Sequence, residues 1–128
     1  MAQSKVDGLA VVLLLSDDPD RTAAFYRDVL GLDLVAEQHD GRHTHYACTT
    51  GAIYFTIQYA GDLAGRPPAH GPDSLQLCFT VPALDAFLQG LARHSLTPLH
   101  PPRRFEHTTY VTLRDPDART VRVMTPWK

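Results

Sequence analysis

Residues 18–32, DPDRTAAFYRDVLGL, carry the strongest local signal in the chain. Asp18 is a favourable N-cap, and Pro19 suits the first position of a helix, where its missing N–H costs nothing. Apolar and small side chains then recur at helical spacing as far as Leu30, and Gly31 can take the left-handed conformation that ends a helix. The stretch therefore predicts a helix that starts after Asp18 and ends at Gly31.

Strand-like segments surround this helix. Residues 9–15, LAVVLLL, form a short apolar run that is typical of a buried strand. After the helix come strand-like segments at 32–39, 44–50 and 52–59, and Asp40-Gly41 after the first of them is a hairpin signal. The first half of the chain therefore predicts the order β-α-β-β-β.

The second half repeats this order after residues 61–73, a stretch rich in glycine and proline. The predicted elements are a half-buried strand at 74–81, a helix opened by Pro82 with Leu84, Phe87, Leu88 and Leu91 on one stripe, and strands near 97–99, 108–113 and 120–125. We expect one domain over residues 1–128, built from two modules at about 5–60 and about 74–128 with a linker at 61–73. The alternative is a single α+β domain without internal symmetry.

The composition excludes several classes of protein. A chain of 128 residues with 44% hydrophobic and 20% charged residues suits one soluble globular domain. Its net charge of −2 predicts neither a nucleic-acid nor a membrane partner, and the short polar start favours a cytoplasmic protein. Cys48 and Cys78 follow no CxxC spacing, so two reduced, half-buried thiols are favoured over a disulfide.

Two motifs carry a resemblance to a known family. The stretch 18–32 and the tail DPDARTVRVM at 115–124 resemble the first helix and the last strand of the vicinal oxygen chelate superfamily, which includes glyoxalase I, extradiol dioxygenases and bleomycin-resistance proteins. The resemblance implies an α+β fold of two βαβββ modules that form curled half-barrel sheets. Helices would cover the convex face, and a ligand would lie on the concave face. It also implies a homodimer, since small members of the family usually form dimers.

The metal ligands of that family are not kept in this chain. In its metalloenzymes they stand on the first and fourth strands of each module. The corresponding positions are Ala10 or Val11, Thr56 or Gln58, Gln76, and Arg122. A guanidinium only donates hydrogen bonds and is always charged, so Arg122 cannot replace the expected glutamate. We therefore expect no metal and no other cofactor. A different site made by His43, His45 and His107 stays open as an alternative.

Alternation along the strands predicts which side chains face a ligand. The predicted ligand-binding residues are Tyr54, Thr56, Gln58, Gln76, Cys78, Tyr110 and Arg122, and Thr112 joins them if residues 108–113 alternate in phase. Aromatic rings stack on flat ligands, and arginine pairs with carboxylate or phosphate. Alternatives are a salt bridge from Arg122 to Asp115 or Glu106, tyrosines packed in a dimer interface, and Cys78 as a small apolar filler.

Three functions fit these residues. The first is a binding protein similar to the bleomycin-resistance branch, which sequesters a small aromatic or anionic ligand in antibiotic resistance or biosynthesis. The second is a metal-independent isomerase, cyclase or lyase on the same scaffold. The third is a metal-dependent glyoxalase or dioxygenase. The missing metal positions count against the third function, binding is favoured over catalysis, and the sequence assigns no catalytic residue.

Overall fold

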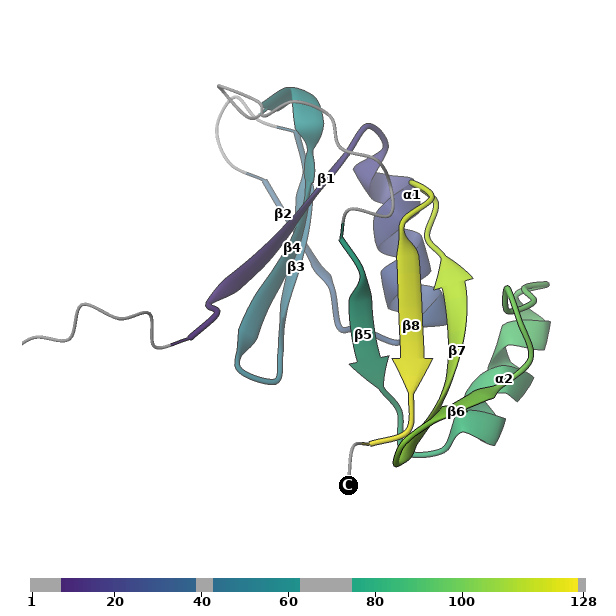
Figure 1. Cartoon of the computed structure of the whole chain (residues 1–128). Helices are drawn as coiled ribbons and strands as arrows, with labels where there is room; N and C mark the ends of the chain where they lie inside the picture. Colours follow the sequence, from purple (N-terminus) through teal and green to yellow (C-terminus); the bar gives the residue numbers. More distant parts are fainter. Residues whose placement is uncertain (1–7, 39–42, 63–74, 127–128) are drawn as a thin grey trace, which may run out of the picture. The chain divides into compact units, whose positions relative to one another are not determined.

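The described part of the chain, residues 8–38, 43–62 and 75–126 of a computed structural model, contains two four-stranded sheets (Figure 1). Each sheet belongs to one of two compact units. The first unit contains β1 (Val11–Ser16), α1 (Pro19–Ala24), β2 (Val35–Glu37), β3 (His45–Thr50) and β4 (Ile53–Tyr59). The second contains β5 (Leu77–Thr80), α2 (Leu84–Arg93), β6 (Arg103–Phe105), β7 (Thr108–Arg114) and β8 (Thr120–Met124). The predicted α+β class and the repeated order β-α-β-β-β are confirmed.

The two sheets share one topology. Their strand orders are β1-β4-β3-β2 and β5-β8-β7-β6. In each sheet the first and fourth strands of the module pair in parallel, and the remaining pairs are antiparallel. The fourth strand of each module, β4 or β8, therefore has a paired strand on both sides. On each face of the sheet, its side chains lie between side chains of the two neighbouring strands.

The first helix forms for the reasons read in the sequence. The Asp18 carboxylate accepts a hydrogen bond from the Arg21 backbone N–H at 3.2 Å, and Pro19 occupies the first turn. The α-helix continues into a π-helical turn, Phe25–Val29, that the spacing does not predict. Gly31 then has a φ of 78°, the left-handed conformation expected at the end of the helix.

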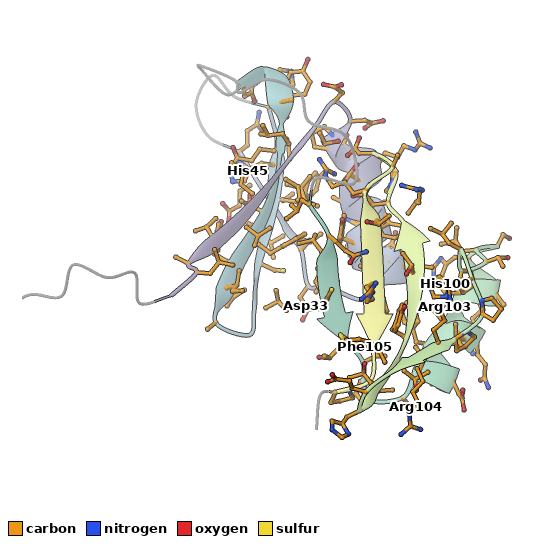
Figure 2. All side chains as sticks on the ribbon, viewed as in Figure 1. Asp33, His45, His100, Arg103, Arg104 and Phe105 are labelled. Atoms are coloured by element: carbon orange, nitrogen blue, oxygen red, sulfur yellow. The ribbon has the colours of Figure 1, made fainter. Side chains whose placement is uncertain are left out.

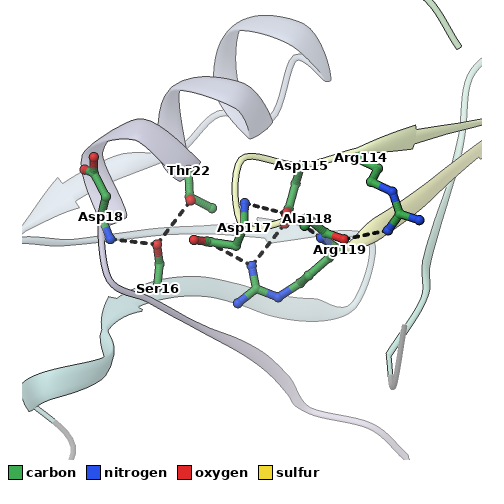
Figure 3. A network of polar contacts seen from close by, with 8 residues as sticks. All are labelled: Ser16, Asp18, Thr22, Arg114, Asp115, Asp117, Ala118 and Arg119. Atoms are coloured by element: carbon green, nitrogen blue, oxygen red, sulfur yellow. Dashed lines mark hydrogen bonds and ion pairs between the residues drawn. The ribbon is translucent and has the colours of Figure 1, made fainter. Parts of the chain in front are cut away.

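The aspartates of the 115–124 motif build the turn between β7 and β8. The buried Asp115 carboxylate accepts hydrogen bonds from the backbone N–H groups of Asp117 and Arg119, both at 2.9 Å (Figure 3). It also pairs with the Arg119 guanidinium at 3.0 Å. Ala118 has a φ of 67°, which these bonds hold in place. The motif that carried the resemblance therefore has a structural role in fixing how β8 returns beside β7.

Alternating residues of the central strands are buried in each unit. In the first unit, α1 contacts β1, β3 and β4, and the buried side chains are Leu14, Ala23, Phe25, Tyr26, Phe55 and Ile57. In the second unit they are Leu84, Leu91, Val111, Leu113, Val121 and Val123. The residues between these on β4, β7 and β8 therefore lie on the opposite face of each sheet.

Some of the strand and helix boundaries predicted in the second half of the chain are wrong. Residues 97–99 are not a strand, and the strand that pairs with β7 is Arg103–Phe105. The Leu99 backbone N–H does donate to the Thr112 carbonyl at 2.9 Å, but prolines at 98, 101 and 102 have no N–H with which to extend a ladder. The helix begins at Leu84 rather than Pro82, because residue 83 is still extended.

The structure also bears on the strand predicted at 32–39 and on the cysteines, whereas the predicted turn and linker lie largely outside the described residues. The strand predicted at 32–39 is shorter, Val35–Glu37. The Asp40-Gly41 turn and nearly all of the 61–73 linker lie outside the described residues. Both cysteines are free thiols, although Cys78 is exposed rather than half-buried. None of the described helices has both the length and the hydrophobicity that a membrane span requires.

Candidate ligand-binding face

One face of the second sheet collects three of the seven predicted ligand-binding residues, together with Thr112. The register places Cys78, Arg122 and Thr112 side by side on β5, β8 and β7, and Thr80, Met124 and Tyr110 in the next row. We call these six residues the Arg122 face. Their neighbours along β7 and β8, such as Val111 and Val123, are fully buried on the other face. The strand pairing therefore places Cys78, Tyr110 and Arg122 on one face of the sheet, as predicted.

The Arg122 guanidinium stacks on an aromatic ring of the same face. Its central carbon lies 4.1 Å from the centroid of the Tyr110 ring, a distance at which a cation and a ring attract each other. The Nε atom is buried and has no hydrogen-bond partner. Asp115, one of the acids considered as a partner for Arg122, pairs instead with Arg119. Protein atoms cover this Nε, but the Arg122 side chain as a whole is only partly buried, so the N–H groups at the end of the guanidinium are the ones that can meet an anion.

His100 completes the arrangement and was not anticipated from the sequence. Its Nε2 lies 2.9 Å from the Thr112 hydroxyl, and its ring meets the Tyr110 ring edge-on with centroids 5.4 Å apart. Its Nδ1 lies 2.7 Å from the carbonyl oxygen of Pro101. Figure 2 shows His100 in the segment that leads into β6. A proline-bounded segment has no periodicity, so no sequence signal indicated the direction of this ring.

Gln76 lies at the margin of the same sheet. It precedes β5 by one residue and is exposed, and its Nε2 donates to the Thr120 hydroxyl at 3.4 Å. Cys78, which follows on β5, is also exposed and stands beside Arg122. These two side chains therefore extend the row of polar groups that begins at Thr112.

The other three predicted residues lie on the first sheet. Tyr54, Thr56 and Gln58 alternate along β4 with the buried Phe55 and Ile57, as predicted. Thr56 is only 2% exposed, and its hydroxyl has no hydrogen-bond partner. Partial burial, followed by the nearby Glu37 charge, raises the pKa of the Tyr54 phenol above its usual value. This phenol therefore stays protonated at neutral pH and can donate a hydrogen bond.

The histidines of the first unit have acidic partners instead of each other. His43 pairs with Asp62 at 2.8 Å, and its ring stacks on Tyr59 with centroids 4.4 Å apart. His45 is nearly buried, and its Nε2 lies 3.1 Å from a carboxylate oxygen of Glu37. In the part of the chain that the structure describes, no three histidine, cysteine or acidic side chains form a group that could hold a metal ion.

The conventional metal positions of the resemblance also do not fit a cation. Val11 offers only an aliphatic side chain beside Tyr54, and Thr56 offers an uncharged hydroxyl. Gln76 already donates to Thr120, and Arg122 carries a permanent positive charge that repels a cation. Divalent ions in such sites need several carboxylate or imidazole ligands. The residues at these positions do not provide such ligands.

Comparison with known proteins connects this geometry to a family. A family model described as Glyoxalase/Bleomycin resistance protein/Dioxygenase superfamily matches residues 8–123. A search of curated protein sequences gives no match. The structures of many known proteins share the fold.

Three of these structures are informative. An integron cassette protein from the mobile metagenome of V. cholerae has a TM-score of 0.76 at 21% identity, over 98% of this chain and 100% of that one. TnmS3, an antibiotic binding protein from Streptomyces sp., has a TM-score of 0.73 at 16% identity, over 98% and 100%. A lactoylglutathione lyase from Agrobacterium tumefaciens has a TM-score of 0.68 at 24% identity, over 94% and 95%. At these identities the likeness extends to the fold alone.

Proposed function

Because the chain belongs to the Glyoxalase/Bleomycin resistance protein/Dioxygenase superfamily, we propose that it binds a small aromatic anion on the Arg122 face and releases it chemically unchanged. The binding needs no metal. The single observation that carries this proposal is the stacked pair of Arg122 and Tyr110, in which the central carbon of the guanidinium lies 4.1 Å from the centroid of the Tyr110 ring. A similar fold serves an antibiotic binding protein, TnmS3, which is consistent with a sequestering role.

The chemistry of the pair explains the class of ligand. A guanidinium presents its N–H donors in a planar fork that matches a carboxylate or a phosphate. The Tyr110 ring holds the guanidinium plane, so less side-chain entropy is lost when an anion binds. Met124 is the register partner of Tyr110 and offers apolar area to a flat ring beside the stacked guanidinium. The face therefore combines one fixed cation with a surface for stacking.

A pair of matched probes tests the proposal. 2-Naphthoate has a flat ring and a carboxylate, and 2-naphthamide has the same shape without the charge. We expect saturable binding of the acid by calorimetry and much weaker binding of the amide. Arg122→Gln should weaken binding of the acid about 10- to 100-fold, because one charge-assisted hydrogen bond contributes about 1.5–3 kcal/mol.

Arg104→Gln is the control variant. It removes the same charge from an exposed residue of β6 whose register position lies on the opposite face of the sheet from Tyr110. Its affinity for 2-naphthoate should equal that of the wild type. Equal binding of 2-naphthoate by wild type and Arg122→Gln, or no saturable binding at all, would contradict the proposal. Mass spectrometry of the ligand after denaturation should return the acid unchanged.

A metal-independent isomerase, cyclase or lyase is the second candidate. It is favoured by the hydrogen bond between His100 and Thr112 and by the exposed thiol of Cys78, which lies in the same row on the other side of Arg122, since a hydroxyl, an imidazole and a thiol can all transfer protons. In that case Arg122→Ala and Tyr110→Phe should lower turnover while the circular dichroism spectrum stays native. A metal-dependent glyoxalase or dioxygenase would instead require about one metal per chain by elemental analysis of protein purified without chelator.

The assembly and the location of the protein are part of the proposal. We expect a homodimer, as the family resemblance implies, and a cytoplasmic protein. Light scattering at micromolar concentration should give twice the 14.2 kDa mass of the chain. A monomer at these concentrations would remove the dimer from the proposal and would leave the binding test on the Arg122 face unaffected.

A further inference from the structure

We propose that the Arg122 face selects aromatic acids that also carry a hydroxyl or another hydrogen-bond donor on the ring. This inference rests on the proposed function and names the class of ligand. It follows from the donor and acceptor roles that the His100 contacts impose on Thr112, and it does not depend on the residues of the first unit.

The proton positions of His100 follow from its two partners. The Pro101 carbonyl can only accept, so the Nδ1 atom at 2.7 Å from it must carry the proton and donate. In a neutral imidazole the other nitrogen, Nε2, then has a free lone pair and accepts. The Thr112 hydroxyl at 2.9 Å from Nε2 is therefore the donor of that hydrogen bond.

Thr112 is thereby left as a pure acceptor. Its hydroxyl has one proton, which is directed at His100, and its remaining lone pairs can only accept. The backbone holds this arrangement, because the Leu99 N–H donates to the Thr112 carbonyl at 2.9 Å and so fixes the segment that carries His100 against β7. A ligand group that meets the Thr112 oxygen must bring its own O–H or N–H.

Arg122 has the opposite polarity in the same row. Thr112 and Arg122 are register partners on β7 and β8, so their side chains leave the same face of the sheet from neighbouring positions. The guanidinium donates only, whereas the hydroxyl accepts only. A ligand complementary to both presents a carboxylate to Arg122 and a hydroxyl to Thr112, and Met124 in the next row of β8 offers apolar area to the ring.

A series of benzoates tests this inference. Calorimetry at about pH 8, where a free imidazole is neutral, gives the dissociation constants of 2-, 3- and 4-hydroxybenzoate and of the three methoxybenzoates. A methoxy group has a similar position but cannot donate. We expect at least one hydroxy isomer to bind about tenfold tighter than its methoxy counterpart, because the counterpart leaves the Thr112 oxygen without a donor. The isomer with the largest ratio reports the spacing between the two groups.

Three variants locate the origin of the preference. In Thr112→Val, which has nearly the same shape and no acceptor, the hydroxy-to-methoxy ratio should fall to within about twofold. In His100→Phe the Thr112 proton becomes free to donate to a methoxy oxygen, so the ratio should fall in the same way. Arg104→Gln should keep the ratio of the wild type. Two independent variants keep the test valid if one of them does not fold.

The possible failures are distinguishable from each other. If benzoates bind in a way that depends on Arg122 but all ratios in the wild type stay within twofold, this inference is wrong and the proposed function stands. A ratio that persists in Thr112→Val and His100→Phe would also overturn it. If no aromatic carboxylate binds saturably, both the inference and the proposed function are wrong.

Discussion

Two replacements of Asp115 remove different parts of the hydrogen bonding in the turn between β7 and β8: asparagine removes the ion pair, and alanine also removes the backbone hydrogen bonds. The side chain is fully buried and makes three contacts, with the backbone N–H groups of Asp117 and Arg119 at 2.9 Å and with the Arg119 guanidinium at 3.0 Å. Asparagine keeps an oxygen that can accept both backbone bonds and loses the ionic partner. Alanine loses all three contacts and leaves two N–H groups without an acceptor.

The structure sets the size of each effect. Arg119 also contacts Asp117 at 3.2 Å and is 16% exposed, so part of its charge stays compensated when Asp115 becomes neutral. We expect Asp115→Asn to lower the free energy of unfolding by about 2 kcal/mol, the value of a charge-assisted hydrogen bond. Asp115→Ala should lower it by about 4 kcal/mol, within the usual range for a broken buried pair. The corresponding shifts of the melting temperature are roughly 8 and 15 °C for a domain of this size.

Urea unfolding followed by circular dichroism, together with calorimetry, measures both variants. Asp117→Asn is the matched control, because it removes one half-buried ion pair that contributes less than about 1 kcal/mol. The order of stability should be wild type and Asp117→Asn, then Asp115→Asn, then Asp115→Ala. If alanine destabilises no more than asparagine at position 115, the two backbone bonds contribute nothing and the account of this turn is refuted.

Three further predictions concern the first unit and the two thiols. Asp18→Ala should lower the free energy of unfolding by about 1 kcal/mol in urea, because the first turn of α1 loses its cap; an unchanged midpoint would contradict this role. Iodoacetamide should label the exposed Cys78 before Cys48, because burial raises the pKa of the Cys48 thiol and so lowers its thiolate fraction. Peptide mapping measures the order of labelling, and the reverse order would exclude this explanation. The hydrogen bond to Asp20 raises the pKa of Tyr46, so the stability it contributes is present at neutral pH and is lost as the pH rises through that raised pKa. The advantage of the wild type over Tyr46→Phe should therefore be constant between neutral pH and about pH 10 and decline above it. An advantage that grew with pH above about 10 would reverse the sign of this linkage.

The fold could be predicted where local chemistry determines it. Asp18, Pro19 and Gly31 specify the ends of the first helical segment through capping and a left-handed residue, and the structure has them in those roles. The proline-rich residues 97–102 gave the wrong strand, because strand propensity does not report which N–H groups a ladder can use. The π-helical turn at Phe25–Val29 has no sequence pattern that separates it from an α-helix, so it could only be found in the structure.

The candidate site could be predicted only as far as strand alternation reaches. The period of two placed Cys78, Tyr110 and Arg122 on one face, and the register confirms that arrangement. Their use as a ligand-binding site remains a prediction. His100 lies outside any periodic element, and its direction depends on hydrogen bonds to Pro101 and Thr112 that form only after folding. Contacts of this kind cannot be derived from spacing along the chain.

Electrostatics indicates why an anion should prefer the second sheet, even though both sheets have the same strand order. On the first sheet, Glu37 is a register partner of His45 and shares a face with Thr56, so a carboxylate already occupies that face. An anionic ligand there would meet a like charge and lose hydration without a fixed cation to compensate it. On the second sheet the fixed charge of that row is Arg122, which is held against the Tyr110 ring. The fold thus provides two equivalent faces, and the charge of a few side chains makes only one of them favourable for an aromatic acid.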